Sequence, residues 1–225
     1  MTASVARAEE AGPPNDAQPA APVARAEQAP KIDLRVEEQG PPIPRKYHVH
    51  DGFYLRVDLG VGALGTDYDF GAASADSHGG TLALDLMIGG TPSRGLALGG
   101  ALLTEAGVSH SVEQRGRSRG DSTVALTLLG PFVDGFFDHK GGFHMGGMLG
   151  VAALDVEDLD GDDEAETLTG FGGAAWAGYD AWVADEWSIG GLVRAGGAIT
   201  KKSADAGDIS AQSFSLGLML SVLYH

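Results

Sequence analysis

Residues 213–224 read SFSLGLMLSVLY, a stretch in which every second residue is large and apolar. Phe214, Leu216, Leu218, Leu220, Val222 and Tyr224 alternate with Ser213, Ser215, Gly217, Met219 and Ser221. A period of two places these sets on opposite faces of a β-strand, whereas an α-helix would spread both around its circumference. The stretch therefore predicts a strand with one continuous apolar face.

The same alternation recurs earlier in the chain. Residues 53–63 read FYLRVDLGVGA, with Leu55 and Val57 on one face and Arg56 and Asp58 on the other. Comparable segments lie at residues 81–88, 96–102, 123–128, 143–151, 170–181 and 187–195. Together these eight segments predict an all-β domain of eight antiparallel strands over residues 51–225.

The apolar faces decide whether this domain lies in water or in lipid. Eight strands that close into a barrel enclose an interior barely wide enough for side chains, and the small and charged residues of the second face fit there. The large apolar residues would then point outward, among them Leu55, Leu84, Leu126 and Leu218. In water such a surface would promote aggregation, whereas a lipid bilayer requires it. We therefore predict a closed up-and-down transmembrane β-barrel, with a soluble ligand-binding barrel as the alternative.

The connections and the aromatic residues predict how the barrel is oriented. Long connections at 66–79, 107–120, 155–168 and 199–210 contrast with short ones at 91–95 and 183–186. Outer-membrane barrels have short periplasmic turns and longer external loops. Aromatic residues near the short turns would form a periplasmic girdle: Phe53, Phe132, Phe143, Trp182, Trp187 and Tyr224.

Residues 1–50 differ in composition from the rest of the chain. They are rich in Ala, Pro, Glu and Gln, and the sequence VARAE occurs at both 5–9 and 23–27. Such a stretch buries too little apolar surface to offset the entropy of ordering it, so we predict a disordered periplasmic tail. Ala6-Arg7-Ala8 resembles the end of a signal-peptidase site, although an alanine-rich stretch contains such a triplet by chance equally well.

The overall composition argues against several other classes of protein. The 225 residues carry a formal net charge of -16, and nucleic-acid binding needs clustered cations instead. The chain contains no cysteine and therefore no disulfide or thiolate site. No run approaches the 18 apolar residues of a transmembrane helix. We predict no cofactor. We also predict no metal site, because the acidic segment 155–166 has Asp163 at the position where an EF-hand that starts at Asp158 needs glycine.

Two segments, HDGFYLRV at 50–57 and the stretch at 213–224, are similar to those of small OmpA/OmpX-type outer-membrane barrels. The resemblance extends over the whole predicted barrel and is one of pattern. It implies a monomeric, porin-like protein of the Gram-negative cell envelope, in contact with outer-membrane lipid and lipopolysaccharide. A last strand that ends in an aromatic residue resembles the signal read by the barrel-assembly machinery, although here Tyr224 is followed by His225.

Four charged residues would face the lumen, namely Arg56, Asp58, Asp85 and Arg194. Charges of both signs in a narrow interior favour mutual pairing, and a selectivity constriction is the alternative. We therefore predict a non-enzymatic barrel with a side-chain-filled lumen and a structural or surface-interaction role. A narrow passive porin is the second hypothesis.

An enzyme acting on lipid A or phospholipid is the third hypothesis. Catalysis would need a serine, a histidine and an acid within hydrogen-bond reach, but His144 is expected in the lumen, away from the histidines of the outer loops. In one outer loop Arg115, Arg117 and Arg119 either contact lipid A phosphates or are simply solvated.

Overall fold

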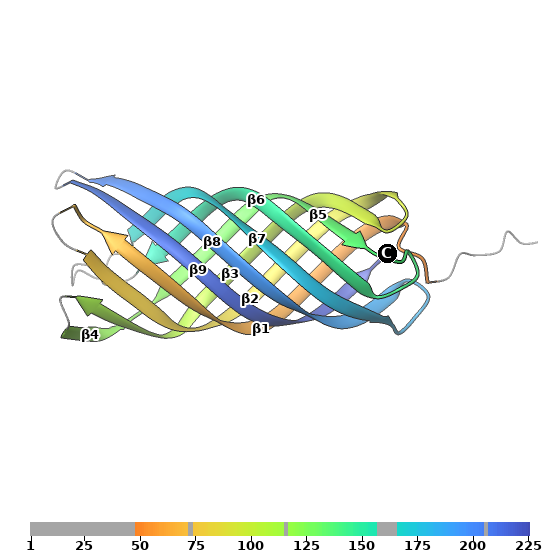
Figure 1. The fold of residues 1–225 in the computed structure, drawn as a ribbon, viewed down its shortest axis with the longest axis horizontal. Coiled ribbons are helices and arrows are strands. Elements are labelled where there is room, and N and C mark those ends of the chain that lie inside the picture. Colours follow the sequence, from red (N-terminus) through yellow and green to blue (C-terminus); the bar gives the residue numbers. More distant parts are fainter. Residues whose placement is uncertain (1–47, 72–73, 115–116, 157–165, 205–206) are drawn as a thin grey trace, which may run out of the picture. The chain divides into compact units, whose positions relative to one another are not determined.

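The computed structural model describes residues 48–71, 74–114, 117–156, 166–204 and 207–225 (Figure 1). The predicted tail up to residue 47, with its signal-peptidase-like triplet, lies outside the described residues. So do Arg115, the side chains of Arg117 and Arg119, and residues 157–165 of the acidic segment.

The described residues form strands throughout the domain. These are β1 (Gly52–Asp69), β2 (Ser74–Ser93), β3 (Leu96–Gln114), β4 (Arg117–Ser122), β5 (Val124–Phe136), β6 (Phe143–Val156), β7 (Glu166–Trp182), β8 (Trp187–Ala204) and β9 (Gly207–Tyr224). The short β4 and the longer β5 both pair with β3 and are separated only by Thr123. They therefore act as one barrel strand, which leaves eight among the described residues.

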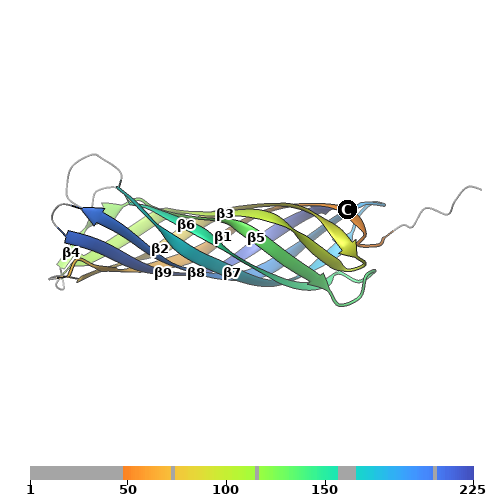
Figure 2. The ribbon, with the colours of Figure 1, turned by 90° about the horizontal axis from the view of Figure 1, so that it is seen from above.

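The strands close into a ring in which every neighbouring pair is antiparallel. Each strand pairs with the next along the chain, and β1 pairs with β9 through Leu55 and Tyr224 at one end and Asp69 and Ser210 at the other. The two views show this closure, with β1 and β9 side by side (Figures 1 and 2). The prediction of a closed eight-stranded up-and-down barrel is confirmed. Among the described residues no helix is long and apolar enough to cross a bilayer.

Because side chains alternate along each strand, the barrel has an apolar exterior and an interior filled with side chains. On β1, Arg56 and Asp58 are fully buried, whereas Leu59 is 63% exposed. Leu84 on β2 and Leu218 on β9 are 53% and 64% exposed. The predicted outward direction of the apolar face is therefore correct on these strands.

The predicted direction of β5 is wrong. Val124, Leu126 and Leu128 are at most 4% exposed and point into the barrel, whereas Leu129 is 55% exposed. The upper lumen, at the end farther from the C-terminus, is packed with apolar side chains from neighbouring strands, namely Leu103, Leu154, Val156 and Leu168. Leu126 points inward because it finds an apolar core there. A period of two separates the two sets of side chains but does not say which set faces the core.

The predicted long loops are mainly continuations of the strands. Pairing of β1 with β2 extends to Asp69 and Ser74, and pairing of β8 with β9 extends to Ala204 and Gly207. β1 and β2 contain 18 and 20 residues, whereas about 9–11 suffice to span a bilayer. The hairpins therefore project beyond the apolar band at the end opposite the C-terminus (Figure 1).

Candidate functional site

The lower lumen, near the short turns and the C-terminus, contains a network centred on Arg56. This guanidinium donates from Nη2 to Asp180 Oδ2 over 2.7 Å and lies 3.4 Å from Asp134 Oδ2. Its Nη1 donates to His144 Nε2 over 3.1 Å. All four side chains are fully buried or nearly so. Arg56 thus links β1 to β5, β6 and β7 across the lumen.

Asp134 is the main acceptor of this network. It accepts hydrogen bonds from the Tyr54 hydroxyl at 2.7 Å, from His144 Nδ1 at 3.1 Å and from Trp176 Nε1 at 3.2 Å. Because His144 accepts at Nε2 and donates at Nδ1, its two ring nitrogens have complementary partners. Three donors and a nearby guanidinium satisfy a carboxylate that burial alone would strongly destabilise.

A second ion cluster in the lumen is centred on Arg194. Arg194 on β8 pairs through Nη1 with Asp85 on β2 and through Nη2 with Glu105 on β3. All three side chains are buried. The strands they join are not neighbours in the ring, so these ion pairs also cross the lumen and fill it.

Asp58 differs from the other three predicted lumen charges. Both its carboxylate oxygens are buried, and none of the ion pairs among the described residues includes it. Its partners in the register are Asp85 on β2 and Ser221 on β9, both of which are buried. The structure therefore brings Arg56, Asp85 and Arg194 into ion pairs and leaves Asp58 without one within the described residues.

Sequence reasoning missed three of the carboxylates that bind these arginines. Glu105 lies beyond the predicted strand 96–102, and Asp134 lies beyond the predicted strand 123–128. Asp180 falls within a segment that carries only weak alternation. All three share the inward parity of buried residues on their own strands, such as Leu103 and Phe132. Extending the period of two through the polar residues would have found them.

Residues 48–51, which precede β1, form a strap across the lower end of the barrel and close the lumen below Arg56. The tail is predicted to extend to His50, yet Val49 and His50 are buried. The His50 N–H donates to His139 O, and its carbonyl accepts from Gly95 N–H, each over 3.0 Å. These bonds attach the strap to the β5–β6 and β2–β3 turns.

The imidazole of His50 fills the opening together with that of His225. His50 Nε2 donates to Gly141 O over 2.9 Å, which leaves Nδ1 to accept from His225 Nε2 over 2.8 Å. The His50 ring stacks on Phe136 with 3.5 Å between centroids. The Trp182 ring covers both histidines, with 4.8 Å between its centroid and that of His50 and 5.0 Å to that of His225.

Both histidines are uncharged at neutral pH. Burial lowers the pKa of His50 to about 4, with a further decrease from Arg56 that exceeds the contribution of His144. Burial likewise lowers the pKa of His225 to about 3, and His50 adds to the decrease. The hydrogen bond between the two imidazoles thus requires a neutral His50, because its Nδ1 is the acceptor.

The predicted aromatic girdle divides into surface and interior residues. Phe53, Phe143 and Trp187 are 47%, 51% and 45% exposed, and Tyr224 lies 5.0 Å from the Trp187 ring. Phe132 is instead 4% exposed inside the lumen, because it shares the inward parity of β5. It packs against Tyr54 and Trp176, with centroid separations of 5.4 and 6.5 Å.

Trp182 lies at the barrel end rather than among the surface aromatic residues. Its ring covers the two histidines, and its Nε1 donates to Lys140 O over 3.1 Å. Of the predicted girdle residues, Phe132 thus lies in the lumen and Trp182 packs on the histidines of the strap.

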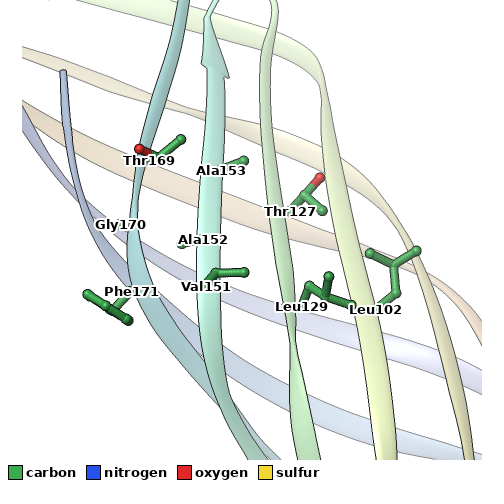
Figure 3. Close-up of a pocket in the computed structure, with 9 residues that line it drawn as sticks. All are labelled: Leu102, Thr127, Leu129, Val151, Ala152, Ala153, Thr169, Gly170 and Phe171. Carbon is green, nitrogen blue, oxygen red and sulfur yellow. The ribbon is translucent and has the colours of Figure 1, made fainter.

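A hollow of about 590 Å³ lies on the outer wall, over β3, β5, β6 and β7 (Figure 3). Leu102 and Leu129 border one side and Phe171 the other, while Ala153 and Gly170 between them carry little or no side chain. Thr127 and Thr169 also line the hollow, next to Ala153 in the register. The outer wall therefore has an apolar groove with hydroxyl groups at one end, which we call the outer groove.

The described residues contain no arrangement typical of a hydrolase or a metal centre. His144 contacts Arg56, Asp134 and Asp180, and no described serine donates to it. No group of three or more His, Asp or Glu among the described residues could hold a metal ion. The described polar residues of the lumen thus link strands to one another.

No protein-family model matches the chain, and neither does any curated protein. Among solved structures, the outer membrane protein OprG from Pseudomonas aeruginosa is 12% identical, with 80% of this chain and 99% of that chain covered and a TM-score of 0.49. Neisserial surface protein A is 16% identical, with coverages of 77% and 96% and a TM-score of 0.44. The outer membrane protease OmpT from Escherichia coli is 11% identical, with coverages of 78% and 97% and a TM-score of 0.40. These similarities concern the fold alone.

Proposed function

We propose that this protein is an integral β-barrel of the Gram-negative outer membrane, with a closed lumen and a structural or surface-interaction role. The outward apolar band carries the proposal. Leu149, Phe171 and Leu220 are 76%, 77% and 74% exposed, and similar side chains face outward on the other barrel strands. Soluble proteins rarely expose apolar patches larger than a few hundred Å², whereas a membrane barrel needs an apolar band about 25 Å tall.

The filled lumen supports a role that involves neither transport nor catalysis. Arg56 and Arg194 each cross the lumen to carboxylates on distant strands, and His50 blocks the lower opening. Above these clusters, Leu103, Leu154 and Leu168 are buried in a common apolar core inside the barrel. A solute would have to displace all three layers to pass.

The asymmetry of the two barrel ends supports the orientation. The short turns and surface aromatic residues lie at the end of the C-terminus, as periplasmic ends do in such barrels. The longer hairpins would then face the cell exterior and contact lipopolysaccharide, and the tail would lie in the periplasm. Recognition of the last strand by the barrel-assembly machinery belongs to the same proposal.

A narrow cation-preferring porin is the second candidate. Five buried lumen carboxylates (Asp58, Asp85, Glu105, Asp134 and Asp180) face two buried arginines. Asp58 forms no ion pair within the described residues, and the excess of acidic over basic side chains in the lumen favours cations.

Insertion and conductance test these proposals together. The purified chain, refolded into phospholipid vesicles, should resist extraction by urea and migrate differently on gels before and after boiling, because a closed barrel has no free edge from which to unravel. Planar-bilayer recordings should show no stable open level. Stable conductance with cation preference would support the porin instead, and failure to insert would contradict the membrane location.

A further inference from the structure

The outer groove lies where the exterior changes from apolar to polar. One row of outward residues, in register across five strands, is entirely apolar: Leu102, Leu129, Val151, Phe171 and Ile199. The next row toward the long hairpins is Thr104, Thr127, Ala153, Thr169 and Lys201. Ala153 interrupts the second row with a methyl group, and the hollow opens there. The outer groove thus runs from the apolar band to its polar edge.

Lys201 supplies a positive charge at this edge. Its Cα is the register partner of Thr169, and paired residues on one face have Cβ atoms about 4.5–5.5 Å apart. Lys202, the next residue, has the opposite parity and lies 3.0 Å from Glu166 Oε1. Lys201 is exposed and forms no ion pair within the described residues. Its ammonium therefore remains available beside the groove.

We propose that the outer groove binds one anionic lipid, with an acyl chain over Ala153 and Gly170 and a phosphoryl group at Thr169 and Lys201. The inference rests on the proposed membrane location, which supplies the lipid. Phe171 and Leu129 border the chain on two sides, and the threonine hydroxyl donates to phosphate oxygens as the ammonium does.

Charge around the groove favours an anionic headgroup at this height. Two outward carboxylates lie one row further toward the hairpins, where Asp155 pairs in register with Thr167 and Asp208 with Ser203. Asp69 lies in the same row as Lys201 but two strands away, across Ser210. Asp155 already accepts the Thr167 hydroxyl over 2.5 Å. A phosphoryl group therefore meets Thr169 and Lys201 before it reaches these carboxylates, which limit how far it extends.

Native mass spectrometry on the refolded full chain tests the site. The protein is equilibrated with phosphatidylglycerol or phosphatidylcholine of identical acyl chains, and the fraction that retains one lipid is measured. One lysine near an anionic headgroup is worth about fivefold in affinity, so retention of phosphatidylglycerol should exceed that of phosphatidylcholine by about that factor. Added inorganic phosphate should not displace the lipid, because the acyl chain supplies part of the binding.

Two pairs of variants separate the chain contact from the charge. Ala153→Phe fills the hollow and should abolish retention of both lipids, whereas Ala177→Phe, on the exposed outer face of β7 away from the hollow, should change neither. Lys201→Gln should bring the two lipids to equal retention, whereas Lys140→Gln, exposed in the β5–β6 turn, should keep the wild-type ratio.

The outcomes distinguish this site from the proposed location. A wild-type barrel that inserts into vesicles but shows no lipid preference, or a Lys201→Gln variant that keeps it, overturns the lipid site and leaves the location intact. Displacement by inorganic phosphate overturns the assignment to a lipid. A chain that does not insert contradicts the location and, with it, the site.

Discussion

The two halves of the lumen are filled by different means. The lower half contains Arg56, Asp134 and Asp180 in a hydrogen-bonded network, and the upper half contains Leu126, Leu154 and other apolar residues in a core like that of a soluble protein. The lower network depends on the pairing of each charge, whereas the upper core depends on volume. We therefore expect the two halves to fail differently when one side chain is removed.

The largest effect is expected in the lower half. Arg56→Met removes the cation between Asp134 and Asp180 and leaves buried carboxylates uncompensated, which costs about 3–5 kcal/mol in the free energy of unfolding. Urea titration of the barrel in lipid vesicles measures this loss. Arg94→Met, exposed in the β2–β3 turn, is the control. A small loss for Arg56→Met would mean that the carboxylates do not depend on it.

In the upper half, Leu126→Ala tests the inward direction of β5. Truncating a leucine in a packed core costs about 2–5 kcal/mol, and Leu126 is 2% exposed. Leu129→Ala is the matched control, because Leu129 is 55% exposed on the outer face of the same strand. Equal losses in the same titration would contradict the inward position of Leu126.

The sequence predicted the strands better than their direction. On β1 and β9 small or charged residues alternate with large apolar ones, so the residue types distinguish the inward face from the outward face. The predicted directions of both strands were correct. On β5 the stretch 124–129 reads VALTLL, and both faces carry leucine where the pattern meets Leu128 and Leu129. The charged Asp134 shares parity with Leu126 and marks the inward face, but it lies outside the predicted strand 123–128.

The ion pairs were predictable only in part. Charged residues on the inward face predict that oppositely charged partners exist. The strands that supply those partners depend on how the ring closes. Arg194 meets Glu105, at a sequence separation of 89 residues, and no local pattern contains that information. The strap was missed because Val49 and His50 adjoin a stretch whose composition predicts disorder.

The exterior is tested by Leu218→Arg on β9. Leu218 is 64% exposed on the apolar band, and an arginine near the bilayer midplane of a barrel costs about 2–4 kcal/mol. Met219→Arg enters the lumen instead, where Met219 is 3% exposed. Moving the outward arginine along β9 toward either interface should restore stability. A Leu218→Arg variant with wild-type stability in vesicles would contradict the lipid-facing assignment.

The smallest effect is expected from pH at the strap. The pKa of His50 falls from 6.5 to about 4 on folding, so between these values the unfolded chain binds a proton that the folded chain does not. Stability is then complete above pH 6.5 and decreases as the pH falls toward 4. Allowing for solvent at the barrel end, we expect His50 alone to account for a loss of about 1 kcal/mol at pH 5, and His225, whose pKa falls to about 3, adds to the loss in the same direction.

His50→Phe preserves the ring that stacks on Phe136 but removes the titrating group. Its urea midpoint should therefore change less between pH 7.5 and pH 5 than that of the wild type, even though the variant loses the hydrogen bond to Gly141. His78→Phe, exposed on β2, should retain the wild-type dependence on pH. If His50→Phe keeps the full loss of stability on acidification, His50 does not carry it. The difference between the two pH values matters here rather than either midpoint alone, because the missing hydrogen bond lowers stability at both.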